Sequence, residues 1–212
     1  MNDLLQRFGF WTCHFNVVAV GTVLTGAFVV QFGYGEFPCP LCIVQRMGML
    51  LAIIGAASII LASRKGHVTP TEYATGYGVS VLASVVGAAG SLRQIALHVC
   101  DAGPDAGYGS AVLGYHLYTW AFIVFAVIVG VSGANLLFCR WLDPHRVHFG
   151  WASRVTVWFV AVLLGANLVA VFAEAGFHAY LPDNPTSYRL LDDLGLGASS
   201  GSDGASSIHS DP

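Results

Sequence analysis

Residues 41–61 read LCIVQRMGMLLAIIGAASIIL, an apolar stretch in which Arg46 is the only charged residue. A helix needs about 20 predominantly apolar residues to cross the hydrocarbon core of a bilayer. The stretch therefore predicts a transmembrane helix. Over the whole chain of 212 residues, 55% are hydrophobic and 10% are charged. Soluble domains contain about 25% charged residues, so the composition indicates a membrane protein.

Four further stretches have the same apolar character. They lie at roughly 10–32, 73–99, 117–138 and 155–177. Only helices and closed barrels satisfy the backbone in lipid, so five such stretches predict an all-α polytopic membrane helix bundle. We expect residues 1–194 to form a single integral membrane domain whose first stretch is retained as a helix. The segment 195–212, rich in Gly, Ser and Asp, offers too little apolar surface to offset the entropy of ordering, and we expect a disordered tail.

Glycines and charged residues give further information on packing and partners. We interpret four glycines as points of close helix packing: Gly87, Gly90, Gly130 and Gly133. The nine Lys and Arg residues against twelve Asp and Glu give a formal charge of −3, without a basic patch. This pattern excludes a nucleic-acid partner. The partners expected from composition are the membrane lipids.

The positive charges separate by side of the membrane. One side holds Arg7, Arg64, Lys65, Arg140, Arg146 and Arg154, and the loops on the other side hold none. Arg46 and Arg93 lie just inside helix ends, and Arg189 follows the fifth stretch on the outer side. Because Lys and Arg are retained on the cytoplasmic side, we expect a cytoplasmic N-terminus and an outer C-terminus. The outer face then contains Cys39, Cys42 and Cys100, whereas Cys13 and Cys139 lie on the cytoplasmic side and are expected to be inert packing residues.

The segment Glu36-Phe-Pro-Cys-Pro-Leu-Cys-Ile-Val-Gln-Arg46 precedes and opens the second stretch. A C-x-x-C motif is typical of dithiol redox centres, and the start of a helix favours a thiolate. Cys42 and Arg46 are four residues apart, so they share one helix face and the guanidinium can stabilise a thiolate or a reduced quinone oxygen. Snorkelling to lipid headgroups would explain a lone Arg, but beside the C-x-x-C motif we favour the redox role.

The run Cys39-Pro-Leu-Cys42-Ile-Val-Gln-Arg46 resembles the DsbB family of quinone-dependent disulfide-generating membrane proteins. Gly114-Tyr-His-Leu-Tyr-Thr-Trp120, which enters the fourth stretch, is similar to the proteobacterial branch of that family. The resemblance implies a four-helix core, here followed by a fifth helix, in the bacterial inner membrane with its active site facing the periplasm. It further implies that Cys42 and Arg46 contact a quinone, ubiquinone or menaquinone, and that Cys39 exchanges disulfides with a DsbA-like thioredoxin-fold protein.

The chain departs from the family pattern in its other cysteines. Typical members have a second cysteine pair in the loop between the third and fourth helices, where this chain has Cys100 alone. Some relatives instead have cysteines near the end of a fifth helix, where this chain has Ala175 and Leu181. The relay from the protein partner to Cys39 is therefore either direct or routed through Cys100, which we retain as a third catalytic candidate.

Three residues late in the third stretch are candidates for quinone contacts: Arg93, Gln94 and His98. Arg93 and Gln94 can donate hydrogen bonds to a quinone carbonyl, with interfacial snorkelling as the alternative. His98 or His116 can exchange protons near neutral pH, or either can be an ordinary interfacial residue. An intramembrane charge usually has a partner, so we expect Glu36 or Glu174 to pair with Arg46 or Arg93. For Glu36 we favour a solvated boundary carboxylate.

Two other functions compete with the quinone-dependent oxidoreductase. Cys39, Cys42, His98 and Cys100 all lie at the outer face and match a tetrahedral zinc site, although this site leaves Arg46 unexplained. Alternatively, Cys39 and Cys42 form a structural disulfide in a scaffold or transport protein, although the stretches contain few charges that would mark a transport pathway. We favour the redox function and expect no metal.

Overall fold

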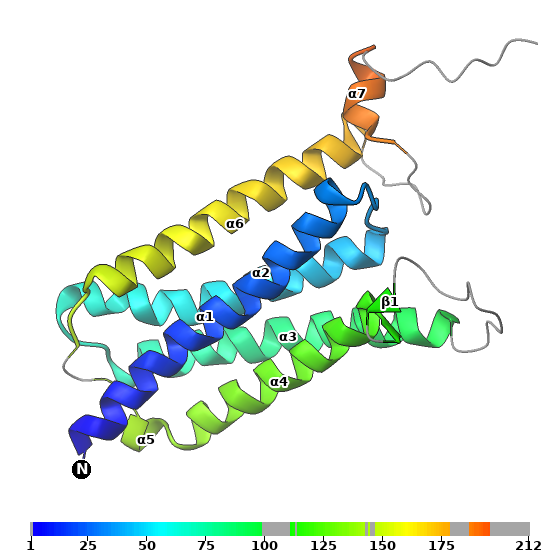
Figure 1. Cartoon of the computed structure of the whole chain (residues 1–212). Helices are drawn as coiled ribbons and strands as arrows, with labels where there is room; N and C mark the ends of the chain where they lie inside the picture. Colours follow the sequence, from blue (N-terminus) through cyan, green and yellow to red (C-terminus); the bar gives the residue numbers. More distant parts are fainter. Residues whose placement is uncertain are drawn as a thin grey trace, which may run out of the picture.

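Five long helices form one bundle in the computed structural model, which describes residues 2–98, 111–112, 114–142, 144, 147–178 and 187–195. They are α1 (Asn2–Gly33), α2 (Pro40–Ala62), α3 (Pro70–His98), α4 (Leu117–Leu137) and α6 (Trp151–Ala175). Each is long and apolar enough to cross a membrane. Figure 1 shows them packed lengthwise against one another. The chain is thus a multi-pass membrane protein, and the expected all-α bundle is confirmed.

Short elements lie at the two ends of the bundle. They are the 3₁₀ turn η1 (Ser63–Lys65), the strands β1 (Ala111–Val112) and β2 (Tyr115–His116), and the helices α5 (Cys139–Leu142) and α7 (Arg189–Asp193). The strands pair antiparallel, with Val112 opposite Tyr115. Figure 1 shows α5 near the N-terminus, and β1 and α7 at the opposite end. That opposite end is also where α2 begins.

The observed helix bounds differ most from expectation in α1 and α6. α1 begins at Asn2 rather than near Phe10, since helical hydrogen bonding continues beyond the apolar stretch on which the expectation depended. α6 covers Trp151–Ala175 instead of 155–177. It ends there because Gly176 has a φ of 59°, a left-handed conformation that favours glycine and terminates helices.

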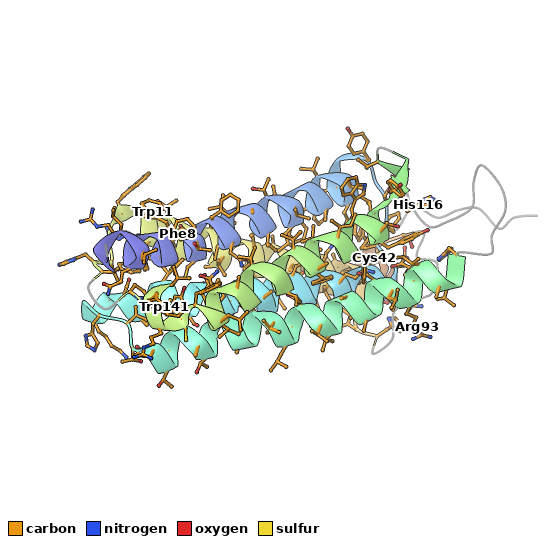
Figure 2. All side chains as sticks on the ribbon, turned by 90° about the horizontal axis from the view of Figure 1, so that it is seen from below. Phe8, Trp11, Cys42, Arg93, His116 and Trp141 are labelled. Carbon is orange, nitrogen blue, oxygen red and sulfur yellow. The ribbon has the colours of Figure 1, made fainter. Side chains whose placement is uncertain are left out.

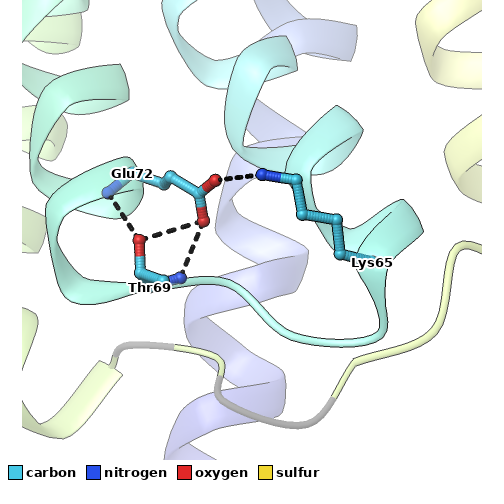
Figure 3. A network of polar contacts seen from close by, with 3 residues as sticks. All are labelled: Lys65, Thr69 and Glu72. Atoms are coloured by element: carbon cyan, nitrogen blue, oxygen red, sulfur yellow. Dashed lines mark hydrogen bonds and ion pairs between the residues drawn. The ribbon is translucent and has the colours of Figure 1, made fainter.

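A capping box fixes the start of α3 (Figure 3). The Glu72 N–H donates to Thr69 Oγ1 at 3.2 Å, and the Thr69 N–H donates to Glu72 Oε2 at 2.9 Å. These reciprocal bonds satisfy backbone donors that the first helical turn leaves free. The ammonium of Lys65 lies 2.8 Å from Glu72 Oε1, which ties η1 to the same residue. The turn between α2 and α3 is thereby defined by local sequence.

Helices α2 and α3 pack closely against each other through glycine. A Cβ added to Gly55 would clash with the carbonyl oxygen of Gly76, so these two backbones meet directly. Gly87 packs in the same way under the ring of Phe125. The interpretation of Gly87 as a packing point therefore holds, but a Cβ added to Gly130 or Gly133 would have no neighbouring atom within 4 Å, so neither serves this role. Hydropathy does not distinguish a glycine that packs against a neighbouring helix from one that does not.

The two ends of the bundle differ in chemistry. Figure 2 shows Phe8, Trp11 and Trp141 near one end, and Cys42, Arg93 and His116 near the other. The first end also carries η1 with Arg64 and Lys65, and the start of α6 with Arg154. Exposed aromatic side chains at a bundle end are typical of a membrane interface. The redox motif and the main cluster of basic residues therefore lie at opposite ends.

Candidate active site

The two cysteines of the C-x-x-C motif flank the first turn of α2. Cys39 caps the helix with an extended backbone (φ −71°, ψ 162°), and its sulfur accepts a hydrogen bond from the Cys42 N–H at 3.3 Å. Pro40 occupies the first helical turn, where its missing N–H leaves no helical bond unmade. Both cysteines are free thiols with their Sγ atoms 2.9 Å apart. One short segment thus builds both the helix start and the dithiol.

Hydrogen bonds around Cys39 favour its thiolate form. The Cys42 thiol donates to the Cys39 sulfur, and this bond is the main cause that lowers the pKa of Cys39 from 9.0 to about 6. Burial opposes the shift, while the N–H groups of Cys42 and Leu41 and the amide of Gln94 add to it. A stabilised thiolate favours the reduced pair, which makes the corresponding disulfide a stronger oxidant.

Two glutamines connect the dithiol to the helix interface. Gln94 of α3 donates from Nε2 to the Cys39 sulfur at 3.3 Å and lies 3.8 Å from that of Cys42. Gln45 of α2 donates to Gln94 Oε1 at 2.9 Å, which orients the Gln94 amide so that its N–H groups face the sulfurs. Gln94 is only 2% exposed. Gln94 thus contacts both cysteines, and the quinone contact expected from the sequence stays a prediction.

Iodoacetamide alkylation should reveal the thiolate of Cys39. In the reduced, quinone-free protein, we expect the alkylation rate of Cys39 to rise with a midpoint near pH 6, because only the thiolate reacts. Mass spectrometry of the modified peptide at each pH measures this rate. Gln94→Leu removes one donor and should move the midpoint upward. A midpoint near 9 in the unsubstituted protein would contradict the hydrogen-bonded thiolate.

Arg46 is held inside the bundle by residues of α1. Its guanidinium donates to Gln31 Oε1, and its Cζ lies 5.2 Å from the centre of the Phe28 ring. Only 8% of Arg46 is exposed, so the side chain does not extend to the surface as a snorkelling Arg would. Glu174 of α6 and Cys42 are among the groups whose charges act on it. Arg46 is thus a buried cation beside the redox pair.

A cavity of about 320 Å³ opens beside Cys42 and Arg46. Its apolar walls come from α1, α2 and the start of α4, and include Val23, Leu24, Ala27, Val30, Met49 and Leu117. Polar groups enter it from Cys42, Gln45, Arg46 and Glu36, and aromatic rings from Phe37, Tyr118 and Trp120. Cys39 is not part of this lining, and it is 6% exposed. The two sulfurs therefore have different surroundings.

The other predicted quinone contacts lie outside the cavity wall. His98 stacks on Tyr118 with ring centres 5.6 Å apart, and His116 stacks on Tyr118 at 5.3 Å. Tyr118 itself lines the cavity, whereas neither histidine is among the lining residues. Arg93 is exposed on α3, and Figure 2 shows it at the same end of the bundle as Cys42. Cys100 lies outside the described residues.

Comparison with known proteins agrees with this arrangement. The model of the family described as disulfide bond formation protein DsbB matches residues 10–135, more than half of the chain. The chain belongs to the DsbB family. A relative from Chromohalobacter salexigens, named disulfide bond formation protein B, is 35% identical over 107 residues, which cover 48% of this chain and 60% of that protein. The protein of the same name from Polaromonas naphthalenivorans is 31% identical over 153 residues, covering 57% and 87%.

These matches define how far the family relationship extends. A third disulfide bond formation protein B, from Chromobacterium violaceum, is 34% identical over 96 residues, 44% of this chain and 55% of that protein. The first relative and this one are thus matched over little more than half of their lengths. No solved structure matches the chain. Helix α6 and α7 lie beyond the residues matched by the family model.

Among the residues that the structure describes, nothing adds support to the alternative of a zinc site. Within those residues, no group of three or more His, Cys, Asp or Glu side chains is placed to hold a metal ion. The His98 Nδ1–H donates to the Gln94 carbonyl oxygen at 2.9 Å and the His98 ring stacks on Tyr118, while the side-chain amide of Gln94 contacts the two sulfurs. The proposed fourth ligand, Cys100, lies outside the described residues.

Several residues of the site were missed by the motif analysis. Gln45, Gln31, Phe28 and Tyr118 each contact a member of the redox pair, Arg46 or the cavity. Gln31 could have been identified from the sequence, because a glutamine near the end of an apolar span needs a polar partner. Phe28 and Tyr118 could not, since aromatic residues are common throughout such helices.

Proposed function

We propose that this DsbB-family protein is a disulfide-forming oxidoreductase that reoxidises a periplasmic DsbA-like dithiol protein and passes the electrons to a membrane quinone. The observation that supports it most strongly is the cavity wall, which contains Cys42 and Arg46 but not Cys39. One sulfur thus faces an apolar site suited to a lipid-soluble acceptor. The other, three residues earlier, remains for exchange with a protein thiol.

The cavity suits a quinone in both size and polarity. Most of its lining is apolar, which matches a ring with an isoprenoid tail, and its volume of about 320 Å³ is in the range of small-molecule sites. Arg46 and Gln45 supply N–H donors for the quinone oxygens, as a few convergent polar groups do in such sites. A bound quinone, ubiquinone or menaquinone, would supply an acceptor for two electrons and two protons.

Exchange with the partner begins at Cys39 of the oxidised pair. A thiolate of the partner attacks the Cys39 sulfur, so that a mixed disulfide forms and the Cys39–Cys42 bond breaks. Cys42 leaves as a thiolate. The second thiol of the partner then attacks the partner's first cysteine sulfur, which is bound to Cys39 in the mixed disulfide. The partner leaves as a disulfide, and Cys39 is left reduced. The two electrons now reside on the dithiol of this chain.

Arg46 and Gln94 make the departure of Cys42 favourable. The guanidinium lies one helical turn along α2 and offers a positive charge to the new thiolate. Gln94 lies within reach of both sulfurs, so its amide can follow the negative charge from one to the other. Once Cys39 is bound to a partner, it no longer accepts the hydrogen bond from Cys42. The thiolate then lies at the cavity wall, where the electrons are needed.

We place the protein in the bacterial inner membrane with the redox end facing the periplasm. The support is the distribution of charge: Arg7, Arg64, Lys65 and Arg154 lie at the end of the bundle opposite Cys42. Positive residues are retained in the cytoplasm, so that end faces inward. A periplasmic dithiol also meets an oxidising compartment, in which disulfides persist.

A trapping experiment tests the protein-facing role of Cys39. In a Cys42→Ser variant the Cys39 thiolate attacks the disulfide of an oxidised partner, forming a mixed disulfide and releasing the partner's second sulfur as a thiolate. Cys42 is absent and cannot resolve this bond, so we expect a covalent adduct with a thioredoxin-fold periplasmic protein to accumulate in cells. Non-reducing electrophoresis and mass spectrometry identify the partner and the cysteine to which it is joined.

The matched control is Cys39→Ser, which should trap no such adduct at Cys42 because that sulfur faces the cavity. An adduct mapped to Cys100 in the Cys42→Ser variant would route the exchange through Cys100. An adduct at Cys42 in the Cys39→Ser variant would reverse the assigned roles and contradict the proposal.

A further inference from the structure

Glu174 is a buried carboxylate at the active-site end of α6. It is 1% exposed, and its Oε1 atom has no hydrogen-bond partner. A carboxylate oxygen without a hydrogen-bond partner is costly to bury, so a nearby positive charge is needed to compensate it. The helix that carries it follows the residues matched by the DsbB family model. The family match therefore assigns this residue no role.

Arg46 is the positive charge that acts on Glu174. α6 packs against both α1 and α2, the helices that carry Gln31 and Arg46. The guanidinium has two neutral contacts, the Gln31 carbonyl oxygen and the face of the Phe28 ring. Neither neutralises it, whereas Glu174 and Arg46 each act electrostatically on the other. The Nε2 group of Gln31 also lacks a hydrogen-bond partner, so polar groups are concentrated at this junction.

We infer that Glu174 is the counterion of Arg46 and positions its guanidinium at the cavity wall, so that the fifth helix is part of the active site. The inference deepens the proposed function and rests on it, because it assigns Glu174 to the cation beside Cys42. Glu174 acts through Arg46 and is a positioning residue.

The pairing gives Arg46 two anionic partners at different stages. When Cys39 and Cys42 form a disulfide the sulfurs are neutral, and Glu174 balances the guanidinium. When a thiolate forms, it shares the guanidinium with Glu174. The carboxylate thus limits how strongly Arg46 stabilises the reduced pair, and the two residues should act on the thiol–disulfide equilibrium in opposite directions.

The test measures that equilibrium in glutathione buffers at pH 7 with quinone-free protein in detergent. Glu174→Gln removes one negative charge while preserving shape, and should shift the Cys39–Cys42 equilibrium about tenfold toward the dithiol. Arg46→Gln should shift it by a similar factor toward the disulfide. In the double variant Glu174→Gln should add little to the shift caused by Arg46→Gln, because Glu174 acts through Arg46. Asn167→Ala, which changes another buried polar residue of α6, should leave the equilibrium unchanged.

Thermal unfolding supplies a second readout that needs no redox chemistry. Glu174→Gln should lower the melting temperature by on the order of 5 °C because it leaves Arg46 buried without its counterion, and the double variant should regain most of that loss. Glu174→Asp, which keeps the charge, should retain the unsubstituted protein's equilibrium more closely than Glu174→Gln. If Glu174→Gln is too unstable to purify, recovery of folded protein on adding Arg46→Gln supports the pairing, and continued loss overturns it.

Additive effects of the two substitutions on the melting temperature, or shifts of the equilibrium in the same direction, would overturn the inference. Both readouts are made without quinone, so they separate this inference from the proposed function. If the two substitutions are coupled but the protein reduces no quinone, the proposed function is contradicted and the Glu174–Arg46 pairing is supported. If the protein reduces quinone but the two substitutions are not coupled, the proposed function is supported and the pairing is contradicted.

Discussion

Replacing Cys42 with alanine is expected to lower the rate of electron transfer from protein dithiols to quinone by at least about a thousandfold. Cys42 is the only one of the two motif sulfurs at the cavity wall, and Arg46 lies one helical turn from it. Alanine leaves Cys39 without a partner for a disulfide and leaves the cavity without a thiolate. The rate is followed by the change in quinone absorbance on adding a reduced thioredoxin-fold protein to the purified variant.

Cys139→Ala is the matched control for the loss of a thiol. Cys139 packs against the hydrophobic core at the other end of the bundle, far along α4 and α5 from the redox motif. We expect this variant to retain quinone reduction close to that of the unsubstituted protein. Full activity of Cys42→Ala would remove Cys42 from the electron path and contradict the proposed function.

The second large effect concerns folding: Gly55→Ala is expected to destabilise the bundle by about 2 kcal/mol. The added Cβ would clash with the Gly76 carbonyl oxygen and lie 2.9 Å from the Ser80 backbone nitrogen. Both are backbone atoms, so no side chain can rotate away and α2 and α3 must separate. Separation also weakens the hydrogen bond from Ser80 Oγ to the Ala52 carbonyl, now 2.7 Å long. Unfolding in mixed micelles measures the loss.

Gly130→Ala provides the comparison, because nothing lies within 4 Å of the Cβ that it adds to α4. Its effect should stay within about 0.5 kcal/mol, as is usual for substitutions without a new contact. Equal destabilisation by both substitutions would contradict the helix contact as the cause, because Gly→Ala by itself raises helix propensity. A neutral Gly55→Ala would mean that the α2–α3 contact is more adaptable than its geometry indicates.

The redox motif illustrates how much local sequence can predict. Cys39, Pro40 and Cys42 lie at a helix start because an extended cap, a proline in the first turn and an apolar run follow one another in the chain. The spacing of Cys42 and Arg46 places them on one helix face wherever that helix packs. These statements depend on neighbours within a few residues, so one segment suffices to make them.

The assignment of Gln94 shows where such prediction ends. Its position late in an apolar span indicates a polar side chain that needs a hydrogen-bond partner. The sequence does not distinguish a quinone carbonyl from a cysteine sulfur as that partner. The structure pairs it with Cys39, Cys42 and Gln45 because α2 and α3 pack closely near this end, where Gly48 lies against Gly87. Its predicted contact with quinone remains a prediction.

By itself, the sequence determined that the chain forms membrane-spanning helices, that a dithiol opens the second of them and that an arginine follows on the same face. These features depend on apolar length and on local spacing. Only the tertiary structure decided that Gln31 bonds to that arginine, that Tyr118 lines the cavity beside the dithiol and that Glu174 is buried on a helix packed against α1 and α2. The reason is that helices in lipid are apolar around most of their circumference, so hydropathy does not reveal which face packs inward. That choice is made by close packing between helices distant in the chain.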